Sequence, residues 1–438
     1  MNLLEIFQKA TSNLPQQTST MSGSITKKPY ICTYPMIMAD GRNYEIKRKL
    51  MEKNREVWID WMRIAACFLV MVVHSTEPFY LGGDGTLVLT RMDALWVALF
   101  DSFARACVPV FVVASSYLQF PVHYSTKEFF RKRAVRILAP FAIWTVVYAL
   151  VYGEPVQNFK DLALNFNYAA GHLWFVYMIV GLYLLMPLLS PWAEKVGRKE
   201  LLFFLGLCFL TSFIPFIREA AIGADAVCIY GPGGIPMQAK YPLWGEASWN
   251  EFGIFYYFSG FIGYLLLGLY LRRFGSEMSW GKTLAVALPC FLVGFAVCVI
   301  GFVRRVMEYS GGVFPTGGEC AVAAVWETPW FYNTFSVALM TIGWVLLFRH
   351  FRFSGKFYRR IVLPVSKASY GMYLCHMLAL GMFSALYRGT FGIGVEGSFG
   401  LMTTPVEIIL TAVSSYVTAA VFCALVQKIP VVGKWLIG

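Results

Sequence analysis

Arg63 and His74 are the two residues whose types and spacing most directly suggest chemistry. They lie eleven residues apart in one long apolar segment, IDWMRIAACFLVMVVHSTEPF. Eleven residues at about 100° each complete almost three helical turns, so both side chains share one face, about 16 Å apart along the axis. A guanidinium can hold an anion, and an imidazole can remove a proton at neutral pH. The pair therefore predicts a site that binds an anion at one end and moves a proton at the other.

Both residues also have a structural interpretation. Arg63 can extend its charged end to the membrane surface, with Asp60 one turn away as its partner. His74 can form a hydrogen bond between helices, although a neutral imidazole is equally suited to deprotonate a hydroxyl group. Because a charge inside a membrane helix is costly, we interpret the pair as functional.

The composition of the chain predicts an all-α, polytopic membrane protein. Of its 438 residues, 58% are hydrophobic and only 14% are charged, whereas average soluble proteins carry about 25% charged residues. The apolar residues form blocks of membrane-spanning length. We expect a bundle of about ten transmembrane helices, at 59–79, 94–118, 134–152, 173–190, 201–217, 252–271, 283–303, 331–348, 364–383 and 405–427.

The distribution of basic residues predicts the orientation. With a cytoplasmic N-terminus, the loops on the cytoplasmic side receive most of the 37 Lys and Arg residues. Seven fall on the opposite side: Arg91, Lys160, Arg218, Lys240, Arg304, Arg305 and Arg388. This bias follows the positive-inside rule, so both termini are expected in the cytoplasm and the chain in the inner (plasma) membrane. The net charge of +12 is explained by topology, and nucleic acid is not an expected partner.

The chain is expected to form one membrane domain between two tails. Residues 1–56 are polar and predict a cytoplasmic tail, residues 57–430 the transmembrane domain, and residues 431–438 a short cytoplasmic tail. Cys228 and Cys320 fall in different external loops, where a disulfide would be chemically reasonable but spacing does not decide it. No Cys-x-x-Cys or His/Cys cluster suggests a metal site, and none is expected.

Two further spans contain paired charges. Arg133 and Arg136 are three residues apart at the start of the third span, which on an α-helix gives a two-pronged site for phosphate. They can also serve only as positive-inside anchors. Asp101 and Arg105, four residues apart in the second span, predict an ion pair facing the bundle interior.

Two later spans contain the remaining candidate residues. The fourth span opens with His172 and Trp174, and the ninth holds Tyr370, Tyr373 and His376. Because these residues lie near or within apolar segments, we expect them to have supporting roles in a site. The structural alternative for His376 is a hydrogen-bonded histidine in the protein core.

These motifs, in this order, make the chain resemble the acyltransferase 3 family of integral-membrane acyltransferases. The motifs are I-D-x-x-R-x-x-A with Arg-x10-His in the first span, R-x-x-V-P-x-F in the second, R-x-x-R in the third, H-L-W-F in the fourth and S-Y-G-x-Y-x-x-H in the ninth. The resemblance covers nearly all of residues 57–430 and is strongest to stand-alone O-acetyltransferases of bacterial surface polysaccharides. One departure is Ser116, where the family often has glycine.

The resemblance implies acyl transfer from cytoplasmic acyl-coenzyme A, most often acetyl-CoA, to a hydroxyl group of an external or lipid-linked glycan. Arg133 and Arg136 would then bind the coenzyme A phosphates, Arg63 would orient the donor, and His74 would act as general base. His74 could instead take the acyl group covalently. The competing functional class is a secondary transporter or flippase of a polysaccharide pathway, which buried charges would also suit.

Overall fold

The computed structural model describes nine stretches of the chain. They are residues 55–80, 91–151, 154–164, 168–222, 244–245, 252–309, 326–391, 404–429 and 432–438. The chain divides into residues 1–56 and a compact unit at 57–438. The expected N-terminal tail (except residues 55 and 56), Cys228 and Cys320 lie outside the described residues.

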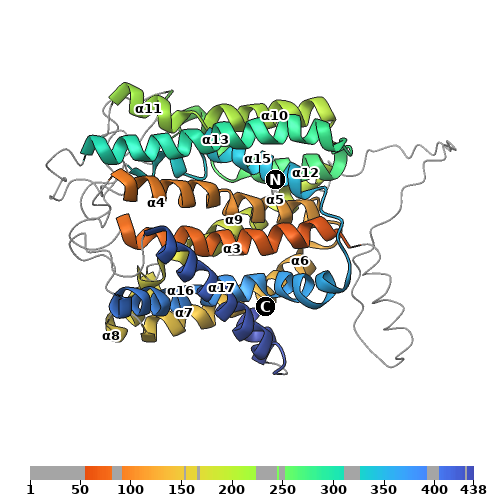
Figure 1. The fold of residues 1–438 in the computed structure, drawn as a ribbon. Helices are drawn as coiled ribbons and strands as arrows, with labels where there is room; N and C mark the ends of the chain where they lie inside the picture. The colour runs from red at the N-terminus through yellow and green to blue at the C-terminus, as the bar shows by residue number, and fades with distance from the viewer. Residues whose placement is uncertain are drawn as a thin grey trace, which may run out of the picture. The chain divides into compact units, whose positions relative to one another are not determined.

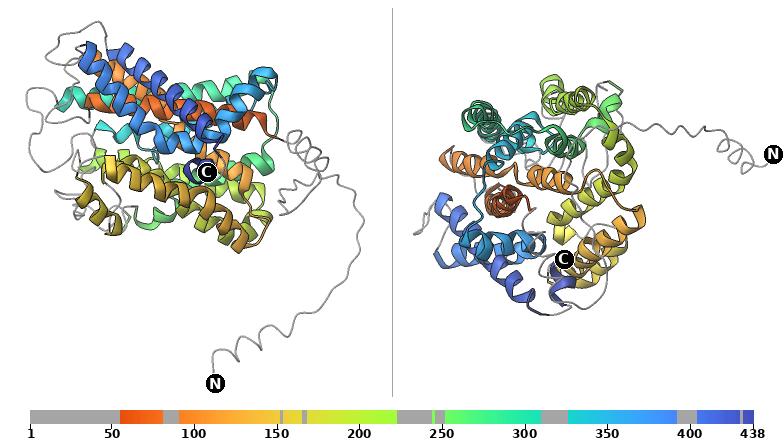
Figure 2. Two further views of the ribbon diagram at one scale, coloured as in Figure 1. Left: turned by 90° about the horizontal axis from the view of Figure 1, so that it is seen from below. Right: turned by 90° about the vertical axis from the view of Figure 1, so that its right-hand side faces the viewer.

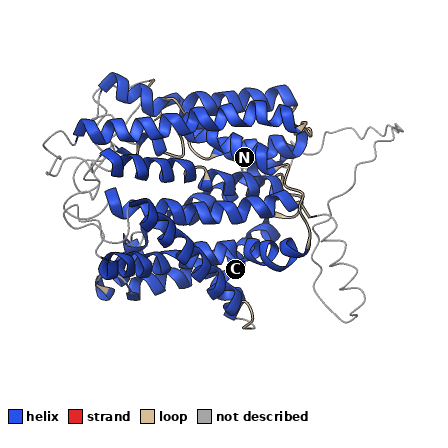
Figure 3. Cartoon of the chain, viewed as in Figure 1, coloured by secondary structure: helices blue, strands red, loops and turns tan. Residues whose placement is uncertain are grey.

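The described residues fold as helices and connecting turns (Figure 3). In a bilayer each backbone N–H and C=O needs an internal partner, which a helix supplies within one segment. The longer helices are α3 (Val57–Tyr80), α4 (Arg91–Ala104), α5 (Cys107–Gln119), α6 (Thr126–Arg133), α7 (Ala139–Val151), α8 (Pro155–Leu164), α9 (Trp174–Lys195), α10 (Arg198–Thr211), α11 (Ile214–Ile222), α12 (Ile262–Phe274), α13 (Trp280–Tyr309), α15 (Phe335–Phe348), α16 (Leu363–Phe391), α17 (Thr404–Val426) and α18 (Val432–Ile437).

Nine of the ten expected spans coincide with helical segments of membrane-spanning length and hydropathy within the described ranges. The segment expected at 252–271 is different, since it consists of a short 3₁₀ helix, Gly253–Phe258, followed by α12. Gly260 between them has a φ angle of +70°, a conformation that side-chain-bearing residues rarely adopt. The chain therefore turns at Gly260 and does not continue as one helix.

Helix α3, which carries Arg63 and His74, packs against α4, α5, α16 and α17. Figure 1 shows α3 between α4 on one side and α16 with α17 on the other, and the end-on view in Figure 2 places it inside the bundle. Most of its apolar side chains are buried. A polar side chain on this helix is therefore surrounded by protein, which agrees with a site in the bundle interior.

The second span is interrupted at the residue that carries its positive charge. Helix α4 ends at Ala104 and α5 begins at Cys107, so Arg105 lies in the break. Pro109 explains the break, because a proline has no N–H to donate to the carbonyl four residues earlier and its ring crowds that carbonyl.

Further along α5, the buried Ser116 donates a hydrogen bond to the Leu265 carbonyl (2.5 Å). Gly268 leaves room for Ser116, since a Cβ there would lie 2.5 Å from the Ser116 Cβ.

The third span contains a π-helical turn between α6 and α7, at Ala134–Leu138. Such a turn is wider than an α-helical one and changes which residues share a face.

The C-terminal residues pack beside this span. Trp144 donates a hydrogen bond to the Leu436 carbonyl (2.8 Å), and α18 contacts α7, α16 and α17. Residues 431–438, expected as a tail, thus include a helix that packs on the bundle.

Candidate active site

A cavity of about 340 Å³ opens along one face of α3. Five α3 residues line it, at the spacing of one helical stripe: Arg63, Val70, Val73, His74 and Glu77. The predicted common face of Arg63 and His74 is therefore confirmed. The cavity joins a guanidinium at one end of the stripe to an imidazole and a carboxylate at the other.

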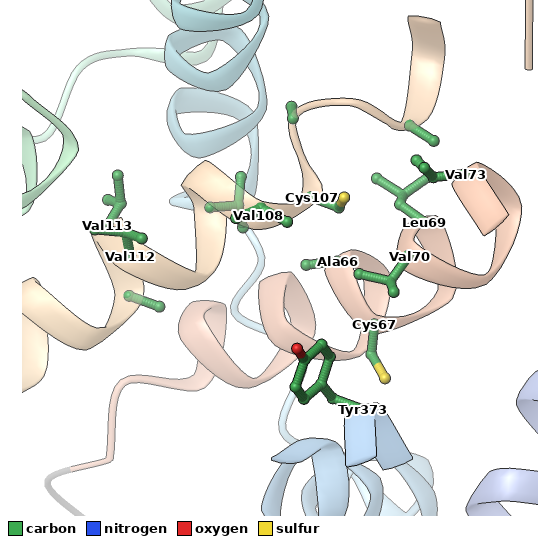
Figure 4. Close-up of a cluster of buried hydrophobic side chains, with 14 of the residues drawn as sticks. Ala66, Cys67, Leu69, Val70, Val73, Cys107, Val108, Val112, Val113 and Tyr373 are labelled. Carbon is green, nitrogen blue, oxygen red and sulfur yellow. The ribbon is translucent and has the colours of Figure 1, made fainter. Parts of the chain in front are cut away.

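The wall between the two ends of the cavity is apolar. Val70 and Val73 on α3, Cys107 and Val108 at the start of α5, and Tyr373 on α16 all line it. Figure 4 shows these side chains clustered around the middle of α3, with the Tyr373 ring reaching toward it from α16. A largely apolar middle between charged ends is typical of a binding site for a ligand of mixed polarity.

His74 forms a hydrogen-bonded pair with Glu77, the residue one turn further along α3. The His74 Nδ1 and Glu77 Oε2 atoms are 2.7 Å apart, and the side chains are 15% and 23% exposed. If Glu77 is ionised, its carboxylate can only accept, and this hydrogen bond then places the proton on Nδ1 and leaves the lone pair of a neutral imidazole on Nε2. This is the arrangement in which a carboxylate orients an imidazole base.

Two further histidines lie in line with His74. The His376 ring centroid is 5.1 Å from that of His74 and 5.1 Å from that of His172. His376 Nδ1 bonds to the Tyr373 carbonyl (2.5 Å), and both His376 and His172 are buried. The Nε2 atoms of His172 and His376 have no hydrogen-bond partner among the described residues. His172 lies in the 3₁₀ turn that precedes α9 and is 8% exposed.

These imidazoles are not arranged as metal ligands. Within the described residues, no group of three or more His, Cys, Asp or Glu side chains is positioned to hold a metal ion.

Arg105 organises a buried polar network beside the His74 end of the cavity. It forms the predicted ion pair with Asp101, which also accepts a hydrogen bond from Thr76 (2.6 Å). A second carboxylate, Glu327, lies 3.2 Å from Arg105 Nη2 and accepts a hydrogen bond from the Tyr80 hydroxyl (2.7 Å). The guanidinium also lies over the Trp330 ring, 4.8 Å from its centroid. The positive charge of Arg105 therefore pairs with two carboxylates, Asp101 and Glu327, which come from distant parts of the chain.

The opposite end of α3 contacts the first turn of α16 and the π-helical turn before it, Tyr358–Val362. Asp60 is buried and accepts hydrogen bonds from the hydroxyls of Tyr358 and Ser366, each 2.6 Å long. Its pairing with Arg63 stays a prediction. Tyr370, which lines the cavity, donates to the Ile137 carbonyl in the π-helical turn (2.8 Å). Through this bond the third span borders the Arg63 end of the cavity.

Arg133 and Arg136 differ in their surroundings, and their predicted common phosphate site stays a prediction. Arg133 is half-buried, donates a hydrogen bond to Gln119 and lies over the rings of Phe129 and Tyr183. Arg136 is exposed. A π-helical turn begins at Ala134, between the two arginines, so their spacing of three residues does not have the geometry of a regular α-helix.

The structure thus brings together most of the predicted site residues. Those that line the cavity are Arg63, His74, Arg105, His172, Trp174, Tyr370 and Tyr373. The lining does not include the other five predicted residues, which are Asp60, Asp101, Arg133, Arg136 and His376.

Glu77 and Glu327 line the cavity, and neither was among the predicted site residues. Glu77 could have been identified from its spacing of three residues after His74. Glu327 carried no such signal, because it lies 222 residues from its partner Arg105.

Comparison with known proteins gives one clear relationship. Neither the curated proteins nor the solved structures searched contain a match to this chain. The model of an acyltransferase domain matches residues 56–425. That match includes every residue that lines the cavity and all of the described spans except the last residue of the final one, Val426. The arrangement of a basic imidazole, an orienting carboxylate and a mixed-polarity cavity is chemically suited to acyl transfer. The chain therefore belongs to the acyltransferase 3 family and is a multi-pass membrane acyltransferase.

Proposed function

We propose that this enzyme transfers an acetyl or other short acyl group from cytoplasmic acyl-coenzyme A to a hydroxyl group of a cell-surface or lipid-linked glycan. The observation that supports this most directly is the single cavity that joins Arg63 to the His74–Glu77 pair. A donor and an acceptor that approach from opposite membrane faces need such a shared space between them. The bias of the Lys and Arg residues supports an orientation with the Arg63 end toward the cytoplasm of an inner membrane and both termini on that side.

In this proposal the donor binds from the cytoplasmic end. Arg136 is exposed at the start of the third span and would attract the coenzyme A phosphates, with Arg133 beside it. The apolar middle of the cavity would accept the pantetheine arm, and Arg63 would orient it. No metal is required for these steps.

His74 would then act as the general base. Its Nε2 removes the proton from the acceptor hydroxyl as the oxygen attacks the thioester carbonyl carbon. The carbon–sulfur bond breaks, and the departing coenzyme A thiolate takes the proton from His74. Glu77 holds the proton-bearing Nδ1 and stabilises the imidazolium that forms between these two proton transfers.

We expect Glu77→Gln to reduce kcat on the order of 10- to 100-fold, because an amide oxygen keeps the hydrogen bond but loses the charge that stabilises the imidazolium. The matched control is Glu194→Gln, which alters an exposed His–Glu contact outside the cavity (His123 Nδ1 to Glu194 Oε1, 3.6 Å). Initial rates with acyl-CoA measure both. A Glu77→Gln enzyme as active as Glu194→Gln would remove Glu77 from the mechanism.

Mass spectrometry of the cell-surface glycans tests the proposed acceptor class. Cells that carry the gene are expected to show a mass increment of one acyl group per modified sugar, and cells without it are not. Restoration of the increment by the wild-type gene, and not by a His74→Ala gene, would support the proposal. Identical glycan spectra with and without the gene would contradict it.

A further inference from the structure

In the part of the chain that the structure describes, the His74 end of the cavity carries more negative than positive charge. Glu77 and Glu327 both line it, with side chains 23% and 22% exposed. Among the described lining residues, Arg63 and Arg105 carry fixed positive charges. Arg63 belongs to the other end of α3, about 16 Å away at the rise of an α-helix.

Arg105 does not neutralise this end. It is paired with Asp101, which is fully buried, and it also contacts Glu327. Two lining carboxylates (Glu77 and Glu327) and the buried Asp101 therefore lie at this end together with one guanidinium, and the proposed general-base role of His74 uses its neutral imidazole. The charges of the described residues at this end therefore sum to a negative value, and they place a bound ligand in a negative potential.

The same end has the groups that recognise a sugar. Trp174 and Tyr332 both line the cavity and stack on each other, with ring centroids 5.5 Å apart at an interplanar angle of 29°. Aromatic rings of this kind pack against the apolar C–H face of a pyranose. His172 lines the cavity, is 8% exposed, and has an Nε2 atom without a hydrogen-bond partner in the described part of the chain. A buried polar atom of this kind indicates a missing ligand group, such as a sugar hydroxyl.

We propose that this end of the cavity is the acceptor subsite and that it selects a sugar without a carboxylate or phosphate group near the acylated hydroxyl. The inference rests on the proposed function and names the class of its acceptor. Neutral and N-acetylated sugars present hydroxyls that donate to Glu327 and to His172 Nε2. A uronic acid places its own carboxylate against Glu77 and Glu327, and like-charge contacts of this type are effective barriers against the wrong ligand.

The test compares two acceptors that differ only at C6 of the sugar. Purified enzyme in lipid vesicles is given labelled acetyl-CoA with either octyl β-glucoside or octyl β-glucuronide, and kcat/KM is measured for each. We expect the glucoside to be preferred by about 10- to 100-fold. In Glu327→Gln the preference is expected to fall several-fold, because one of the opposing charges is removed while its hydrogen bonds to Tyr80 and Arg105 can be kept.

Glu277→Gln is the matched control, since this carboxylate is 79% exposed, pairs with Arg352 and is not among the cavity residues. Its glucoside preference is expected to equal that of the wild type. Equal transfer to both acceptors by the wild type, or a preference that Glu327→Gln leaves unchanged, would overturn the inference while leaving acyl transfer intact. Transfer to neither acceptor would contradict the proposed function itself. The wild-type ratio requires no variant, so the test holds even if Glu327→Gln fails to fold.

Discussion

Replacement of His74 by alanine is expected to lower kcat for acyl transfer by about 10²- to 10⁴-fold, the range that a positioned general base contributes. The imidazole lines the cavity, its Nδ1 is held by Glu77, and its Nε2 has the basic lone pair. Within the described cavity lining, His172 is the other imidazole, and it has no carboxylate partner that orients it in the same way. The measurement is acyl transfer by purified, reconstituted enzyme.

His123→Ala is the matched control for this variant. His123 also contacts a glutamate, Glu194, but it is 55% exposed and lies outside the cavity lining. It should retain wild-type activity. If His74→Ala is also as active as wild type, both the general-base and the covalent mechanism fail.

Labelled acyl-CoA without an acceptor separates these two mechanisms. A general base leaves the protein unlabelled, whereas a covalent acyl-histidine leaves label on the wild type and none on His74→Ala. We expect no lasting label.

Arg105→Met is expected to destabilise the fold by about 3–5 kcal/mol, which is the cost of removing one member of a buried ion pair. Arg105 is 6% exposed, and its removal would leave Asp101 fully buried without its countercharge. Glu327 would lose the same partner. The thermal midpoint of the purified protein in detergent, and its yield from membranes, measure the effect.

The exposed pair of Arg352 and Glu277 provides the comparison. Its side chains are 62% and 79% exposed, so Arg352→Met should cost at most about 1 kcal/mol. Adding Asp101→Asn to Arg105→Met should recover part of the lost stability, since the unpaired charge is removed. Equal thermal midpoints for Arg105→Met and Arg352→Met would show that the Arg105 network does not stabilise the bundle.

The sequence was sufficient to predict the membrane spans and the common face of Arg63 and His74 on α3, because a bilayer limits the composition, length and backbone hydrogen bonding of the segments that cross it. Spans must be apolar, long enough to cross and internally hydrogen-bonded, so hydropathy alone located nine of the helical segments described. The common face of Arg63 and His74 followed from helix geometry. The ion pair of Asp101 and Arg105 followed from a spacing of four residues.

Features that depend on the tertiary structure were not predictable in this way. A π-helical turn begins between Arg133 and Arg136, and residue spacing that assumes an α-helix cannot anticipate it. Glu327 reaches Arg105 from 222 residues away, and His376 lies between His74 and His172 through packing of three separate segments. Such contacts depend on how the helices pack against one another, and a local pattern of residues does not predict that packing.

Acyl transfer in sealed vesicles tests the central claim most directly. Purified enzyme is reconstituted with labelled acetyl-CoA on the side of the N-terminus and octyl β-glucoside available on the other. We predict that label appears on the glucoside hydroxyls with the wild type and with His123→Ala, and that it falls by about 10²- to 10⁴-fold with His74→Ala. No acceptor label with the wild type, or equal label with His74→Ala, would contradict an acyltransferase that uses His74 as its base.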